Sequence, residues 1–225
     1  MTQIISAVQQ KGGVGKSTFL CALGSWLAAD GADVAIVDTD PQQNSDRWMT
    51  VSEKAGNDPG VTVYSCLDDI NLFSVIKKLK EQHDAVLIDT AGYDSAMTVF
   101  CIQASDLVLI PVAPSALDVA GALKVWSYTI ASAENARREI DTALIFNHAN
   151  PRARITEEVR ASLVAQDAPL LTATVPTLTA FREMMTYGGP PEGKARTAFG
   201  AVVSELQQAG RLHYYAGPQL KAVGA

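Results

Sequence analysis

Short apolar runs alternate along the chain with longer stretches in which apolar residues recur at helical spacing. The apolar runs predict buried strands at Gln3–Gln9, Asp33–Asp38, Val61–Ser65, Asp84–Asp89, Leu107–Val112, Thr142–Asn147 and Leu170–Val175. The periodic stretches predict helices at Ser17–Asp30, Asp68–Gln82, Leu117–Ala133, Thr156–Gln166, Thr179–Tyr187 and Lys194–Ala209. This alternation is typical of parallel βαβ units. We therefore expect an α/β fold with a doubly wound, mostly parallel sheet and helices on both faces. A ligand should bind at the carboxyl ends of the strands, near a topological switch point.

The predicted elements follow one another without an internal repeat or a linker long enough to divide the chain. We expect a single domain over residues 1–212 and a C-terminal tail over residues 213–225. The tail holds Gly217, Pro218 and Gly224 and has no sustained apolar stripe, which argues against an amphipathic membrane helix. The chain also shows no long apolar window and no signal-peptide pattern, so we expect a cytoplasmic protein without a membrane partner.

Composition and charge narrow the possible functions. With 225 residues, of which 48% are hydrophobic, the chain can bury one sizeable core. The formal net charge is −6, so DNA binding would require a local basic patch. Cys21, Cys66 and Cys101 form no C-x-x-C pair and lie among apolar residues, which indicates buried thiols in a reducing compartment. The three histidines show no metal-ligand spacing.

The segment Gln10–Thr18 lies between the first predicted strand and the first predicted helix, which is the position of a phosphate-binding loop. Its glycines allow the backbone to curl until several N–H groups point at phosphate oxygens. The start of the following helix adds its positive dipole end. The residues that we expect to bind the nucleotide here are Gly12, Gly13, Val14, Gly15, Lys16, Ser17 and Thr18.

Two side chains of this loop have distinct chemical tasks. The ammonium group of Lys16 can reach the β- and γ-phosphates, and the Ser17 hydroxyl can coordinate Mg²⁺. Gln10 stands where the usual pattern G-x-x-x-x-G-K-[ST] has its first glycine, so the loop is a deviant form.

Four segments resemble the ParA/MinD family of P-loop ATPases, which includes plasmid and chromosome partition proteins. They are the loop KGGVGKST, the stretch DTDPQQN at Asp38–Asn44, VLIDTAG at Val86–Gly92, and IPVAPSALD at Ile110–Asp118. The resemblance is good over about the first 120 residues and looser as far as Tyr187. In its short length the chain is similar to the small plasmid-partition type. The resemblance implies ATP and Mg²⁺ as the ligands.

Three carboxylates are candidates for binding magnesium or for positioning the attacking water. Asp89 ends an apolar strand, where it can hold the water shell of the metal. Asp38 and Asp40 follow the second strand two residues apart, so one can approach Mg²⁺ while the other positions the attacking water. The resemblance implies that Asp40 orients the water, which leaves Ser17, Asp38 and Asp89 as the predicted metal site.

A second lysine in the loop, Lys11, is not needed to bind one nucleotide within the same chain. The resemblance implies that Lys11 crosses a dimer interface and contacts the partner's nucleotide, as an arginine finger does. The predicted catalytic residues are thus Lys11, Lys16 and Asp40, and we expect a homodimer that forms on ATP.

The resemblance also places a base-contacting residue at Asn147 and the other wall of the base pocket at Pro176. Guanine recognition would require N-K-x-D, whereas the segment Asn147–Asn150 reads NHAN. ATP is therefore the expected nucleotide.

The function implied by the resemblance is a slow ATPase, stimulated by a DNA-binding or cargo adaptor protein, that partitions plasmid or chromosomal DNA by binding DNA non-specifically on the nucleoid. Two alternatives remain at this point: a positioning ATPase for another cargo, in conjugation or organelle spacing, and an ATP-dependent metabolic ligase on the same fold. The doubled lysine and DTDPQ favour the switch proteins over the ligase. Candidate cations for DNA binding are Arg152, Arg154, Lys194 and Arg196, with Arg211 and Lys221 nearer the C-terminus.

Overall fold

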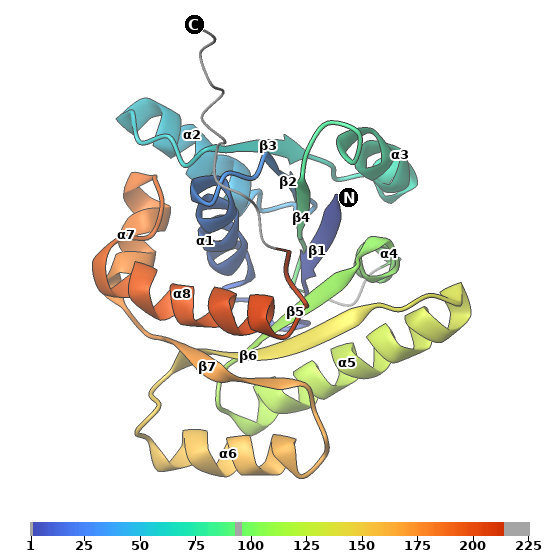
Figure 1. The fold of residues 1–225 in the computed structure, drawn as a ribbon, viewed down its shortest axis with the longest axis vertical. Coiled ribbons are helices and arrows are strands. Elements are labelled where there is room, and N and C mark those ends of the chain that lie inside the picture. The colour runs from blue at the N-terminus through green and yellow to red at the C-terminus, as the bar shows by residue number, and fades with distance from the viewer. Residues whose placement is uncertain (1, 93–95, 214–225) are drawn as a thin grey trace, which may run out of the picture.

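The computed structural model describes residues 2–92 and 96–213, and it contains one seven-stranded sheet (Figure 1). The strands lie in the order β3-β2-β4-β1-β5-β6-β7, and every neighbouring pair is parallel. The strands are β1 (Gln3–Ala7), β2 (Val34–Asp38), β3 (Val61–Ser65), β4 (Ala85–Asp89), β5 (Leu107–Val112), β6 (Asp141–Ala149) and β7 (Leu170–Pro176). The prediction of a doubly wound parallel sheet is confirmed. Of the predicted tail, only His213 lies within the described residues.

Helices cover both faces of the sheet (Figure 1). They are α1 (Lys16–Ala29), α2 (Asn44–Ala55), α3 (Asp69–Leu79), α4 (Ala96–Ala104), α5 (Ala116–Ala136), α6 (Arg154–Val164), α7 (Thr179–Tyr187) and α8 (Gly193–Gln208). Successive strand residues point to opposite faces. Ile5 of β1 packs in a cluster with α1, α2, α7 and α8, whereas the neighbouring Ile4 packs in a cluster with α3 and α4. A third cluster joins β5 and β6 to α5 and α6.

Strand β1 lies at the point where the chain reverses its direction of travel across the sheet. β4 is its neighbour on one side and β5 on the other, so the chain crosses over β1 between these two strands. The register aligns Ala7 with Asp89, and Asp89 with Asp38. The loops that follow β1, β2 and β4 therefore meet at one edge of the sheet, where a doubly wound fold binds its ligand.

Helices α2 and α4 were not predicted from the sequence. The segment of α2 is mostly polar, and Trp48 is the large apolar side chain that it buries, with 1% exposed. Tertiary contacts stabilise this helix: the Trp48 indole donates to Gly189 O at 3.1 Å, and Gly189 N donates to Ser52 Oγ at 2.9 Å. Helix α4 is apolar throughout, so it lacks the period that identifies an amphipathic helix.

Two smaller expectations can be compared with the described residues. Cys21, Cys66 and Cys101 are free and buried, as predicted. Within residues 2–92 and 96–213, no helix combines the length and apolar character needed to cross a membrane.

The packing of α2 against the segment after α7 leads to a test of stability. Gly188 has φ +80° and ψ 177°, and a Cβ there would lie 2.5 Å from Ser52 Cα. We expect Gly188→Ala to lower the free energy of unfolding by about 3 kcal/mol or more, because backbone strain and a backbone clash add. Gly56 is a matched control, since it has φ +67° but open space around the same position. Gly56→Ala should cost only about 1 kcal/mol. Urea unfolding measures both, and equal losses would contradict the steric explanation.

Candidate functional site

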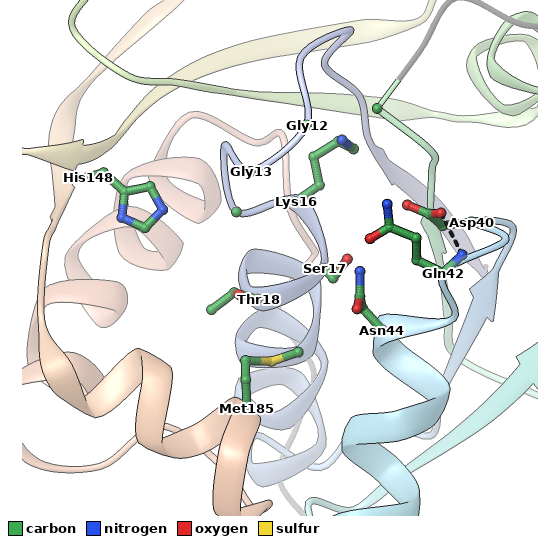
Figure 2. A pocket seen from close by; sticks show the side chains of 12 residues that line it. Gly12, Gly13, Lys16, Ser17, Thr18, Asp40, Gln42, Asn44, His148 and Met185 are labelled. Atoms are coloured by element: carbon green, nitrogen blue, oxygen red, sulfur yellow. Dashed lines mark hydrogen bonds between the residues drawn. The ribbon is translucent and has the colours of Figure 1, made fainter.

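The loop between β1 and α1 borders a cavity of about 440 Å³ at the carboxyl edge of the sheet (Figure 2). Gly13 and Gly15 have φ values of +77° and +88°, a backbone conformation that glycine adopts without strain. Gly15 is also the N-cap of α1, so the unpaired N–H groups of the first helical turn face the cavity region. The lining residues are Gly12, Gly13, Gly15, Lys16, Ser17, Thr18, Asp40, Gln42, Asn44, Gly92, His148 and Met185.

The structure thus brings most of the predicted loop together with Asp40 around one cavity. Val14 is buried instead, with 4% exposed. Five lining residues were not predicted from the sequence: Gln42, Asn44, Gly92, His148 and Met185. Gly92 ends the VLIDTAG segment, and that motif was the signal that could have identified it. A Cβ at Gly92 would lie 2.9 Å from Gly12 Cα and 3.2 Å from Lys16 Nζ. Close approach of the two loops therefore requires glycine at this position.

Lys16 and Asp89 form the electrostatic centre of the site. Lys16 is 7% exposed, and its burial lowers the pKa of the ammonium group, although the charges of Asp89 and Asp40 act in the opposite direction. Burial raises the pKa of Asp89 to about 7, and the nearby charge of Asp38 contributes to the rise. In the absence of a ligand, both charged forms are therefore poorly solvated.

The environment of Asp89 fits a divalent cation. Its Oδ2 accepts a hydrogen bond from Ser45 Oγ at 2.7 Å, and the nearby Ser17 hydroxyl acts to lower the pKa of this carboxylate. Its Oδ1 is buried and has no hydrogen-bond partner among the described residues. A hydroxyl and an uncommitted carboxylate oxygen are ligands of the type that Mg²⁺ prefers. Ser17 and Asp89 are thus the residues that could hold magnesium.

Asp38 has a different environment from the one predicted. Its Oδ2 accepts from the backbone N–H groups of Ser45 at 2.9 Å and Asp46 at 3.2 Å, at the start of α2. Its Oδ1 accepts from Asp40 N at 3.1 Å. These contacts give Asp38 a structural role, and its place in the metal site stays a prediction. Its observed contacts hold α2 and Asp40 in place.

Asp40 borders the cavity beside Lys16 (Figure 2). Asp40 is 8% exposed, and its Oδ1 accepts a hydrogen bond from Gln42 N at 2.8 Å. This bond fixes the orientation of the group while Oδ2 is left as an acceptor. A water molecule in the cavity could be held there.

Lys11 is not among the residues that line the cavity, although it belongs to the same loop. Its ammonium group lies 3.0 Å from Asp118 Oδ2, in the first turn of α5. The Lys11 side chain is 55% exposed, whereas that of Asp118 is 2% exposed. Lys11 is therefore available at the surface, outside the lining of its own cavity.

Asn147 lies at the end of β6, next to the phosphate loop. It is 4% exposed, and its Nδ2 donates to Val14 O at 2.7 Å. Because the Val14 carbonyl requires a donor, this contact assigns the amide orientation and leaves Asn147 Oδ1 as an acceptor. Pro176 is the last residue of β7 and pairs with Ala149. Neither Asn147 nor Pro176 lines the two cavities of this region.

A second cavity of about 370 Å³ adjoins the first and shares Thr18, His148 and Met185 with it. Its other lining residues are Thr177, Leu178, Phe181, Arg182 and Thr186. The two cavities therefore form one cleft from the phosphate loop to α7.

Three of the cations predicted to bind DNA are engaged within the chain. Arg154 pairs with Glu158 at 2.7 Å, Arg196 stacks over the Trp26 ring at 5.0 Å, and Arg211 lies 3.5 Å from Asp141. Arg152 and Lys194 have no ion pair among the described residues, and Lys221 lies outside them. DNA binding by this set stays a prediction.

A curled glycine loop at a helix N-terminus, with its lysine facing the acid that ends a neighbouring strand, is the phosphate-binding arrangement of P-loop nucleoside triphosphatases. The fold and the site together define this class of protein.

Comparisons with known proteins identify the family. A family model described as "VirC1 protein" matches residues 2–189. The ParA protein of Rhizobium radiobacter is 30% identical over 192 residues, which cover 83% of each chain. The maintenance of carboxysome distribution protein A of Halothiobacillus neapolitanus is 29% identical over 188 residues, or 82% of this chain and 84% of that protein. The septum site-determining protein MinD of Pyrococcus horikoshii, solved with Mg-ADP, superposes with a TM-score of 0.76 at 23% identity, over 93% of this chain and 98% of that one.

This chain belongs to the ParA/MinD/VirC1 family of P-loop ATPases.

The raised pKa of Asp89 leads to a test on the metal-free protein. A folded-state pKa of about 7 exceeds the value of about 3.9 in an unfolded chain. The proton on Asp89 therefore stabilises the fold fully below about pH 4, and this stabilisation is lost as the pH rises through 7. Because asparagine stays neutral, Asp89→Asn should lose less stability than wild type as the pH rises. We expect the Tm of the variant to rise relative to that of wild type between pH 5 and pH 8. Thermal unfolding in EDTA measures this difference, and parallel Tm profiles would contradict it.

Proposed function

We propose that this chain is a Mg²⁺-dependent ATPase that acts as a switch: it dimerises with ATP bound and is reset when a partner protein stimulates hydrolysis. The observation that carries the proposal is the unpaired buried oxygen of Asp89 beside Lys16, at the base of the glycine loop. Burial disfavours the charged form of each group, and a nucleotide phosphate with its metal would favour both charged forms.

Each part of the nucleotide has a candidate partner. The loop from Gly12 to Thr18 supplies backbone donors for the phosphates, and Lys16 supplies the cation. Ser17 and Asp89 would hold Mg²⁺, which when bound neutralises charge on the phosphate oxygens. Asp38 acts indirectly, through α2 and Asp40.

Asn147 supports adenine as the base. With Nδ2 committed to Val14, the side chain offers a carbonyl oxygen. The amino group of adenine is a donor, whereas guanine presents a carbonyl oxygen at the same ring position. An acceptor on the protein therefore favours ATP.

The surface position of Lys11 supports a homodimer. Its exposed side chain can leave Asp118 and reach a nucleotide held by a partner chain, where it would stabilise charge on the transferring phosphoryl group. Among the described residues, no second lysine or arginine lines the phosphate cavity, so catalysis would depend on dimerisation.

For the cargo, DNA partition in the cytoplasm is the first proposal, with non-specific DNA binding in the ATP state and a DNA-binding adaptor as partner. One relative is named for the maintenance of carboxysome distribution, which keeps organelle positioning as a second candidate. Binding of the ATP-bound protein to random duplex DNA across a salt series tests the DNA-binding part of the first proposal, since phosphate contacts weaken steeply with salt.

We expect Lys16→Ala to abolish ATP binding, because the variant loses the cation at the phosphates. Isothermal titration calorimetry with Mg-ATP measures the loss. The matched control is Lys194→Ala, at an exposed position on α8 outside both cavities, and it should bind as wild type does. An affinity of Lys16→Ala within about threefold of wild type would remove Lys16 from this role.

We expect Asp40→Ala to bind ATP but scarcely to hydrolyse it, because the loop and Lys16 remain while the water is no longer oriented. Size-exclusion chromatography with Mg-ATP should then show a trapped dimer. Adding Lys11→Ala to this variant should weaken the dimer, since the contact across the interface is lost. Hydrolysis by Asp40→Ala at the wild-type rate would show that another group orients the water.

A further inference from the structure

Strand β6 ends in a bulge that directs two successive side chains to different places. Asn147 pairs with Val175 and Ala149 with Pro176, so His148 is an extra residue without a counterpart on β7. Its φ is +53°, in the left-handed region, which histidine adopts more readily than most residues. Because of the bulge, Asn147 turns inward to Val14 while His148 remains exposed at the cleft. Bulges of this kind re-aim side chains beside active sites.

The His148 ring lies where the two cavities meet. It lines both of them, and a Cβ built on Gly15 would be 3.1 Å from its Nε2. Figure 2 shows the ring across the loop from Asp40, with Thr18 and Met185 between the two sides. A nucleotide whose phosphates rest on the loop would therefore pass His148 as it enters the second cavity.

Arg182 on α7 lines the second cavity but not the first. Neither its guanidinium nor the His148 imidazole has a hydrogen bond or ion pair within the described parts of the chain. Burial and the charge of Arg182 both lower the pKa of His148, so both favour the neutral form of the ring. A neutral aromatic ring and an unpaired cation thus face the same space.

The rest of this space suits a flat heterocycle. Leu178, Phe181 and Met185 give it an apolar lining, and Thr177 and Thr186 add hydroxyl groups. Arg182 is absent from the phosphate cavity, which argues against a role on the phosphates. The nucleoside is the part of a nucleotide that both side chains could contact together.

We propose that His148 and Arg182 contact the nucleoside, with the imidazole packed against the purine ring and the guanidinium donating hydrogen bonds to the same nucleoside. This inference rests on the proposed ATP-binding function, and it extends the base contact beyond Asn147. The triphosphate remains bound by the loop and Lys16. Removal of the imidazole should therefore weaken binding of ATP and leave binding of a bare triphosphate unchanged.

The experiment uses two substitutions of His148 that separate the ring from the backbone strain. His148→Asn removes the ring but tolerates positive φ, and His148→Phe keeps a ring but strains the backbone. We expect His148→Asn to melt near the wild-type temperature and to lose about tenfold in ATP affinity, the effect of one lost base–aromatic contact. His148→Phe should melt lower and bind ATP within about threefold of wild type. Titration calorimetry with Mg-ATP and with magnesium tripolyphosphate measures both ligands.

Arg182→Ala should also weaken ATP binding without changing tripolyphosphate binding. Its matched control is Arg152→Ala, since Arg152 is exposed and lines neither cavity. If His148→Asn binds ATP as wild type does, or loses tripolyphosphate to the same degree, the assignment of His148 is wrong while the proposed function stands. If the wild-type protein binds neither ligand, the proposed function fails first.

Discussion

Two opposite charges, Lys16 and Asp89, are buried beside each other at the carboxyl edge of the sheet, and the rest of the site is arranged around them. Removal of each charge from water costs several kcal/mol, which a nearby opposite charge offsets only in part. The pKa of Lys16 is lowered and that of Asp89 is raised, because burial disfavours the ionised form of each group. Phosphate and magnesium would reverse both effects. In the proposed function, the fold thus holds both groups in position before either ligand binds.

Close packing maintains this arrangement. Gly92 approaches the Gly12 backbone so closely that no side chain fits, which holds the end of β4 against the loop. Asp38 connects α2 to Asp40. One oxygen of its carboxylate accepts a hydrogen bond from Ser45 N at the start of α2, and the other accepts one from Asp40 N. Movement of α2 would therefore move Asp40, because the two share Asp38. The position of the residue proposed for hydrolysis is coupled to a helix that Trp48 and Ser52 tie to the segment after α7.

Local sequence signals predicted the parts of this structure that depend on local chemistry. Apolar runs located all seven strands, most clearly β4 and β5, which are buried along their whole length as central parallel strands are. The glycine loop was evident because glycine, lysine and serine have few other reasons to stand in that order between a strand and a helix. Helix α2 was missed because contacts with residues more than 130 positions away stabilise it. The contacts of Asp38 could not be predicted from its spacing to Asp40, because they depend on the backbone N–H groups at the start of α2. No sequence pattern identified His148, since the bulge that places it at the cleft depends on pairing with β7.

The ion pair of Lys11 with Asp118 bears on how a dimer would be controlled. Asp118 is 2% exposed, and its Oδ1 already lacks a partner among the residues described. Withdrawal of Lys11 would leave a buried carboxylate without its countercharge, which is costly. Only a strong anion at the new position can compensate, and the triphosphate of a partner chain carries one more phosphate than the diphosphate does. If Lys11 crosses the interface as proposed, the ion pair within each chain opposes dimerisation, and loss of the terminal phosphate removes the charge that outweighs it. The same contact would then make the dimer depend on ATP and allow it to separate after hydrolysis.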